Sequence, residues 1–444
     1  MIAQRHPRWT RHLLALAACL LAGGASAQVL RLGSLLELAR ANDAQYAAAR
    51  AAFDAGREKL PQAIAANRPQ INLSYSERQN RDGSTAYDGT KIYDAGGAAL
   101  TVTQTLFRLA NQAGTELAEL QVQLAQQQLQ AAEQDLLLRV ARGYFDVLQA
   151  QDELAAATAQ KEALTQQLNQ ARRGFELGMS PVTDFNEAQA RHDLGVAQEI
   201  AARGELASRT RVLEKSIARP LGSLARLSDG ASVTLIDAQT QDDLVAAAPR
   251  SGLQVLIGRT VAQIAQKEVE RREAGHHPTL DLVATLRRDR NVNFGQFGGS
   301  NTRQFSVGVE LALPLYQGGL VSSRVREALA ESQRAQQELS NAERQARLDA
   351  QQAQLGVASG AALTRALVQA LSSSETQLRS TQRGLQVGVR TRVDVLNAEQ
   401  QLFVTRKDLA AARYRTVLAG LQLRAAAGAL TEADLRMLDS LLAD

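Results

Sequence analysis

Few residues of this sequence have the types and spacing that catalysis or metal binding requires. His276 and His277 are adjacent, so their side chains would point in different directions, and no cysteine or third histidine lies near them in the sequence. The sequence contains no convincing match to a glycine-rich phosphate loop, a nucleophile motif or a catalytic pair of acids. We therefore expect no enzyme, no cofactor and no metal site. Energy for any transport must come from a partner protein.

The composition favours long helices over several compact cores. The 444 residues include 8 prolines and only 4% aromatic residues, while Ala, Leu, Gln, Glu and Arg are abundant. Cys19 is the single cysteine, which excludes a disulfide framework and a cysteine-rich metal site.

The first 27 residues have the features of an export signal. Three arginines and no acid precede or flank an apolar run over residues 12–21, and Ala25-Ser26-Ala27 matches a cleavage site. We expect cleavage after Ala27; the alternative is a lipoprotein box in which Cys19 carries the lipid. Without these three arginines, the 50 basic residues fall to 47 against 46 acidic ones, so nucleic acid is not an expected partner. No later apolar stretch reaches the roughly 18 residues of a membrane helix.

The rest of the chain is a duplication with an offset of 209–210 residues. The matching blocks are 68–73 with 277–282, 100–107 with 309–316, 173–178 with 383–388, and Asp184 and Ala188 with Asp394 and Ala398. We predict a first repeat over 28–238, a second over 239–430 and a tail over 431–444. Each repeat contains a helix, two strands, a long helix, a turn and a helix. A belt segment over 217–238, with a short strand at 233–236, joins the repeats.

Two pairs of strands have lengths suited to a membrane. Apolar and other residues alternate cleanly over 303–315, and more weakly over 69–79, 98–107 and 278–288. About 10 residues suffice for a tilted strand to cross a bilayer. The intervening segments are rich in Gly, Asn, Asp and Ser, as exposed loops should be.

The predicted helices are unusually long. Residues 110–177 contain no proline and would form a helix of about 100 Å, and 319–387 are similar. Over 392–426, a heptad places Val395, Leu402, Leu409, Thr416 and Leu423 on one seam and small residues on a second seam.

Four such strands cannot close a barrel within one chain, and an open sheet edge has no partner in lipid. We therefore predict a fold that is mainly α with membrane β, in which three copies form a trimeric 12-strand β-barrel. A long α-helical coiled-coil tunnel in the periplasm continues this barrel. Two alternatives are amphipathic hairpins on a soluble core and a periplasmic coiled-coil spacer or adaptor without a pore.

The sequence resembles the TolC family of trimeric outer-membrane exit ducts over essentially all of residues 30–430. The resemblance rests on Leu60-Pro61, the strand ends at 104–107 and 313–319, residues 140–148, and the blocks 173–193 and 383–414. It implies a homotrimer embedded in outer-membrane lipid that projects into the periplasm. The implied partners are a periplasmic adaptor (membrane fusion) protein and an inner-membrane pump, either an ABC exporter or a proton-driven pump.

The expected cargo is protein exported by type I secretion, and the alternative is a drug or another small molecule moved by an efflux pump. The lipid-anchored efflux branch usually carries a Trp-containing segment soon after its Cys. The only Trp here, Trp9, lies in the signal, which favours the secretion branch.

The resemblance also implies a periplasmic gate near the helix tips. The family's gate arginine falls on Arg390, its first ring aspartate on Asp394, and the facing Thr-Asp pair on Thr183 and Asp184. In a trimer, three copies of Asp394 would surround a narrow axis, where like charges raise each other's pKa and attract cations. The alternative is an ordinary solvated carboxylate, and Arg390 could likewise be an ordinary charged residue at a helix start.

Two gate positions depart from the family pattern. Leu385 replaces the gate tyrosine, so its hydrogen bond to the aspartate at position 184 cannot form. Asn397 replaces the second ring aspartate, which leaves one charged ring. The turns at 178–181 and 388–391 contain Gly178, Met179, Gly388 and Val389; the resemblance implies that they dock the adaptor, and the alternative is a plain helix cap.

Overall fold

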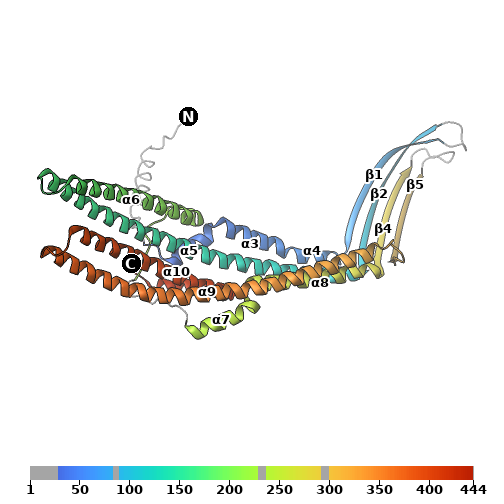
Figure 1. Ribbon diagram of the computed structural model, residues 1–444. Coiled ribbons are helices and arrows are strands. Elements are labelled where there is room, and N and C mark those ends of the chain that lie inside the picture. The colour runs from blue at the N-terminus through green and yellow to red at the C-terminus, as the bar shows by residue number, and fades with distance from the viewer. Residues whose placement is uncertain (1–28, 84–89, 229–236, 292–299, 444) are drawn as a thin grey trace, which may run out of the picture. The chain divides into compact units, whose positions relative to one another are not determined.

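The computed structural model describes residues 29–83, 90–228, 237–291 and 300–443. The expected export signal and the expected strand at 233–236 lie outside these residues. The described helices are α2 (Leu32–Asn42), α3 (Ala44–Arg57), α4 (Lys59–Ala65), α5 (Leu109–Glu176), α6 (Val182–Ile217), α7 (Ala238–Ser251), α8 (Leu253–Glu273), α9 (Leu320–Gln386), α10 (Arg392–Ala426) and α11 (Glu432–Asp439), with a 3₁₀ turn, η1 (Ala274–His276) (Figure 1). None of the described helices combines the length and the hydropathy needed to cross a membrane.

Six strands accompany the helices in the part of the chain that the structure describes. They are β1 (Gln70–Gly83), β2 (Thr90–Phe107), β3 (Arg226–Leu227), β4 (Thr279–Asn291), β5 (Ser300–Ala312) and β6 (Leu442–Ala443). Four of them form one antiparallel sheet in the order β1-β2-β4-β5, and β3 pairs with β6.

The large strands differ in their bounds from the predicted ranges 69–79, 98–107, 278–288 and 303–315. Strands β1, β2 and β4 continue beyond the apolar alternation, because polar residues such as Arg81 and Arg290 still pair across the ladder. Strand β5 ends earlier than predicted, at Ala312, because Pro314 lacks the N–H group that a ladder requires.

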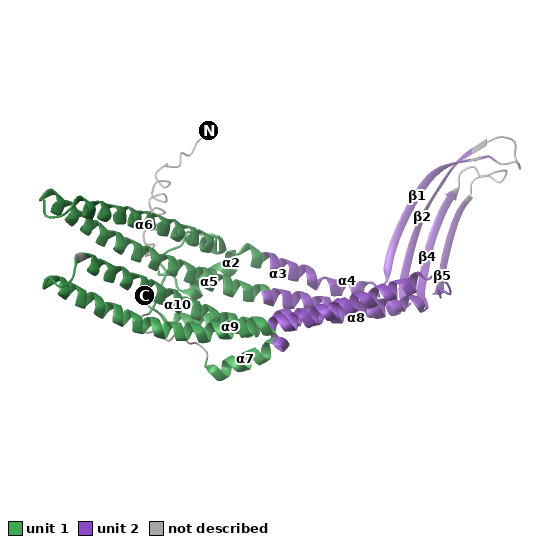
Figure 2. Ribbon diagram, in the orientation of Figure 1, with its two compact units in different colours: residues 1–47, 132–248, 347–444 green, residues 48–131, 249–346 purple. Residues whose placement is uncertain are grey.

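The chain divides into two compact units that do not coincide with the two sequence repeats. One unit contains residues 1–47, 132–248 and 347–444, and the other contains 48–131 and 249–346 (Figure 2). Both α5 and α9 contribute residues to both units, because each of these helices is more than 65 residues long.

The first unit contains two helical hairpins, α5 with α6 and α9 with α10. Both predicted seams of α10 are buried, including Leu402, Leu409 and Leu423 on one seam and Ala398 and Ala412 on the other. Small residues of α9 face this seam: a Cβ added to Gly356 would lie 3.2 Å from that of Ala419. The small side chains therefore permit the close helix approach that a coiled coil needs.

The C-terminal tail, whose order the sequence does not predict, is packed against α2. Leu435 and Leu438 of α11 are buried, and α11 contacts α2. The N–H of Gly33 donates to Asp439 Oδ2 (2.9 Å), and Arg40 pairs with Glu432 (3.1 Å). The tail thus fixes α2 within this unit.

The second unit contains the four-stranded sheet and the helical segments at one end of its strands. There α8 packs on α9 through a small apolar cluster of Val255, Ala262, Ala335, Leu339 and Ala346. His276 and the following His277 are exposed where α8 leads into β4.

The sheet has one apolar face and one polar face. Leu73, Leu100, Leu286 and Phe305 form one row across the four strands, and Ile71, Val102, Ala284 and Val307 form the next row on the same face. Asn72, Thr101, Thr285 and Ser306 form a row on the opposite face.

The apolar face is exposed in the single chain. Phe305 is 72% exposed, Leu73 is 75% exposed and Leu311 is 70% exposed. The outer strands β1 and β5 also have no neighbour on their outer edges within the described sheet. A face and two edges of this kind require an apolar environment and further strands.

Candidate functional site

The turn between α5 and α6 is a glycine-capped helix end. The N–H of Gly178 donates to the carbonyl of Phe175 (2.9 Å), and the N–H of Met179 donates to that of Gly174 (2.8 Å). Gly178 has φ +71°, the left-handed conformation that completes a Schellman motif. The sequence Gly-Met at this point therefore fixes where the helix stops.

The turn between α9 and α10 repeats this geometry 210 residues later. Gly388 has φ +78°, and its N–H donates to Leu385 (3.1 Å), while that of Val389 donates to Gly384 (2.9 Å). A Cβ on Gly384 would lie 2.7 Å from Cγ of Arg390, so the returning chain also needs a glycine there. Met179 and Val389, the exposed residues after each capping glycine, occupy equivalent positions.

The two tips differ in their side-chain packing. Phe175 and Phe185 stack across the first hairpin with ring centroids 6.2 Å apart, and the guanidinium of Arg172 lies 5.9 Å from the centroid of the Phe185 ring. The equivalent positions of the second hairpin are Leu385 and Val395. The first tip therefore has aromatic contacts that the second lacks.

Asp394 has a structural role that the sequence analysis missed. Its Oδ2 accepts hydrogen bonds from the N–H and the hydroxyl of Thr391 (both 2.9 Å), and Thr391 Oγ1 accepts from the N–H of Asp394 (3.2 Å). This is a capping box at the start of α10. The hydrogen bonds from Thr391, aided by the charge of Arg390, hold the pKa of Asp394 below its ordinary value. The Thr-x-x-Asp spacing was the signal for it.

The other predicted gate residues lie near the same turns, but hydrogen bonds do not connect all of them. Thr183 Oγ1 lies 3.5 Å from Asp184 Oδ1 at the start of α6, and among the described residues neither bonds to Arg390. Asp184 and Val393 of α10 do line a common cavity of about 500 Å³. Asn397 lines another cavity, beside Glu399.

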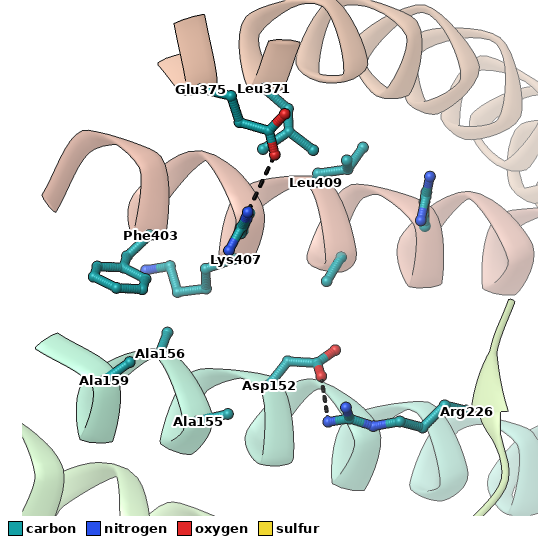
Figure 3. A pocket seen from close by; sticks show the side chains of 13 residues that line it. Asp152, Ala155, Ala156, Ala159, Arg226, Leu371, Glu375, Phe403, Lys407 and Leu409 are labelled. Carbon is teal, nitrogen blue, oxygen red and sulfur yellow. Dashed lines mark hydrogen bonds and ion pairs between the residues drawn. The ribbon is translucent and has the colours of Figure 1, made fainter. Parts of the chain in front are cut away.

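Away from the tips, a cavity of about 760 Å³ separates α5 from α9 and α10 (Figure 3). On one side Arg226 pairs with Asp152 (2.8 Å), and on the other Arg406 pairs with Glu375 (3.1 Å). Figure 3 shows these two ion pairs on opposite walls, and neither crosses the cavity.

The two hairpins are joined at one end of this cavity. The hydroxyl of Tyr414 in α10 donates to Asp152 Oδ2 in α5 (2.8 Å), and the rings of Tyr414 and Phe145 lie 5.6 Å apart. Burial, together with the charge of Asp152, raises the pKa of Tyr414, so the hydroxyl stays protonated and can donate. The hairpins are thus fixed to each other near Tyr414 and separated by cavities towards their tips.

Paired long helices with a four-stranded, half-apolar sheet define a channel protein of the outer membrane, as the comparisons with known proteins show. The outer membrane efflux protein family matches residues 35–219 and 259–429. The chain is 32% identical to outer membrane protein TolC of Vibrio cholerae, covering 91% of this chain and 92% of that protein. It is also 32% identical to the proteases secretion protein PrtF of Dickeya chrysanthemi, covering 96% and 94%.

Solved structures have the same fold at lower identity. The CmeC outer membrane channel of Campylobacter jejuni superposes with a TM-score of 0.78 at 13% identity, covering 92% of this chain and 89% of that one. VceC of Vibrio cholerae gives 0.74 at 18% identity, covering 89% and 96%. The chain belongs to the outer membrane efflux protein (TolC) family. The predicted fold class and outer-membrane location are confirmed, and its relatives are channels rather than enzymes.

Proposed function

We propose that three copies of this chain form a closed duct across the outer membrane and the periplasm. The observation that carries this proposal is the sheet, with its exposed apolar face and two unpaired outer edges. Four strands are too few for a barrel, but three sheets joined edge to edge give twelve. Joining also satisfies the edge N–H and C=O groups that lipid cannot.

Within this role, we propose that the duct exports protein in type I secretion with a periplasmic adaptor and an ABC exporter. PrtF and the alkaline protease secretion protein AprF of Pseudomonas aeruginosa, which is 30% identical over 90% of this chain, support this choice. The second candidate is small-molecule efflux with a proton-driven pump, which the 26% identical outer membrane efflux protein BepC of Brucella suis favours.

Complementation distinguishes these two roles. The chain would be expressed in a bacterium that lacks its own TolC-family duct but retains an ABC exporter, an adaptor and a protease cargo. The secretion role predicts protease in the medium without restored drug resistance. Restored resistance without secreted protease would instead identify an efflux duct.

For the periplasmic end, we propose that the two tips dock the adaptor. Met179 and Val389 are exposed apolar residues on identically folded turns, so each trimer would present six similar contact points. Changing both to Asp should abolish export, because a charge cannot be buried in an apolar contact without a partner. The trimer should still assemble, since both side chains are exposed. Cross-linking to the adaptor measures docking, and unchanged cross-linking would contradict the assignment.

We also propose that Asp394 forms a carboxylate ring at the entrance. Asp394→Ala should weaken channel block by multivalent cations and slightly lower Tm, because it removes both the charge and the capping box. Asp394→Asn should weaken the block equally while keeping more of the cap, because its amide oxygen can still accept from the N–H of Thr391. Planar-bilayer recordings with a trivalent cation measure the block. Equal block in wild type and both variants would place the ring elsewhere.

The assignment of Arg390 as a gate residue gives a separate expectation. Arg390→Ala should raise the basal conductance of the closed channel, because the variant lacks the charge that we propose links the tips in the closed trimer. Its aliphatic part also lies over Gly384, so Arg390→Met, which keeps much of that packing, is the control for a purely structural effect. If the charge of Arg390 keeps the channel closed, both variants should have a higher basal conductance than the wild type. A channel as closed as the wild type would refute the role.

A further inference from the structure

Two arginines stand side by side at the end of the apolar face of the sheet. Arg288 of β4 is directly opposite Arg303 of β5, in a row that continues through Ala98 to Tyr75. This row is the next one after Leu73, Leu100, Leu286 and Phe305 on the same face. Both arginine side chains are exposed.

Like charges directly opposite each other on neighbouring strands destabilise a sheet, because their side chains start only about 5 Å apart. The neighbouring arginines avoid this: Arg287 pairs with Asp289 on the polar face (2.7 Å), and Arg290 pairs with Glu77 (2.7 Å). Arg288 and Arg303 have no such ion pair among the described residues.

The acidic residues on this face of the sheet do not neutralise the charges of Arg288 and Arg303. In the described strands they are Glu77 and Asp94. Glu77 already accepts hydrogen bonds from Arg290 and from the hydroxyl of Tyr75 (2.6 Å). Asp94 lies on the neighbouring strand β2, but four residues along the strand from Ala98, the partner of Arg288, and it accepts from Gln79. Among the described residues, no acid on this face pairs with the two guanidinium groups, which are therefore available to an anion from outside.

The position of the pair indicates which anion. The helices α4, α5, α8 and α9 adjoin one end of the strands, and Arg288 and Arg303 lie towards the other end. In the proposed duct the apolar face meets lipid tails, so the next row lies at the depth of the lipid headgroups. Ala98, directly beside Arg288 on β2, is small and leaves room for a headgroup.

We propose that Arg288 and Arg303 bind a phosphate group of an outer-leaflet lipid. The oxygens of one phosphate can accept charge-assisted hydrogen bonds from both guanidinium groups at once, which turns the repulsion between them into a site. The inference rests on the proposed function, since that function places the apolar face in the membrane.

Native mass spectrometry of the purified trimer with added lipid A tests the site. The double variant R288Q/R303Q should bind phosphorylated lipid A roughly tenfold or more weakly, because both cationic partners of the phosphate are removed. The control R344Q/R347Q removes the same charge from exposed positions of α9 and should bind like the wild type.

Two further arms identify the ligand. Dephosphorylated lipid A should bind the wild type as weakly as the phosphorylated form binds R288Q/R303Q, and millimolar inorganic phosphate should not displace the lipid. Three results would each contradict the lipid site. They are equal binding of lipid A by the wild type and the double variant, equal binding of the two forms of lipid A by the wild type, and displacement of the lipid by phosphate. If the double variant is still a conducting trimer, a change in its lipid binding tests the lipid site alone. The proposed function fails only if the wild type itself does not conduct.

Discussion

Val307→Arg should prevent the protein from inserting into the outer membrane. Val307 lies on the apolar face, 57% exposed in the single chain, in the row with Ile71, Val102 and Ala284. A charged residue on the lipid face near the bilayer midplane costs about 2–4 kcal/mol per copy, and a trimer contains three copies. The variant should therefore be lost from the washed outer-membrane fraction.

Ser306→Arg is the matched control for this substitution. Ser306 is adjacent in the chain but points to the opposite, polar face, opposite Thr285. An arginine there meets water in the proposed duct, so membrane insertion should be unchanged and only conductance should alter. If Ser306→Arg blocked insertion and Val307→Arg did not, the two faces of the sheet would be reversed.

Leu435→Ala should loosen the attachment of the C-terminal helix α11 to α2. Leu435 is fully buried between α11 and its neighbours, and truncating such a leucine costs about 3 kcal/mol. Leu438 then remains as the other buried leucine of α11. Ion pairs such as Arg40 with Glu432, whose side chains are partly exposed, contribute little. Limited proteolysis should therefore cleave the tail of the variant much faster than that of the wild type.

Met437→Ala is the control on the same helix, because Met437 is half exposed. Its tail should resist the protease as the wild type does. Equal protection of all three proteins would show that α11 is held by something other than its buried leucines.

The sequence predicted those elements whose cause is local and periodic. The heptad of α10 identified the residues that are buried, because every seventh residue of a helix returns to the same side. Alternation similarly identified the apolar face of β5, because successive side chains of a strand point to opposite faces. The duplication predicted two equivalent tips.

What the sequence analysis missed depends on contacts between distant segments or on a short capping pattern. Asp152 and Tyr414 bond across 262 positions, and no local period relates them. The tail helix is not predicted either, although Thr431 and Asp434 form the same capping box as Thr391 and Asp394. Reading Thr-x-x-Asp as a helix start would have predicted both.

The central claim is that several copies must join to complete the membrane sheet and enclose a pore. The most direct measurement is the mass of the detergent-purified protein followed by its conductance in a planar bilayer. The account predicts three copies per particle and stable ion-conducting channels. A water-soluble single chain that gives no conductance would contradict it.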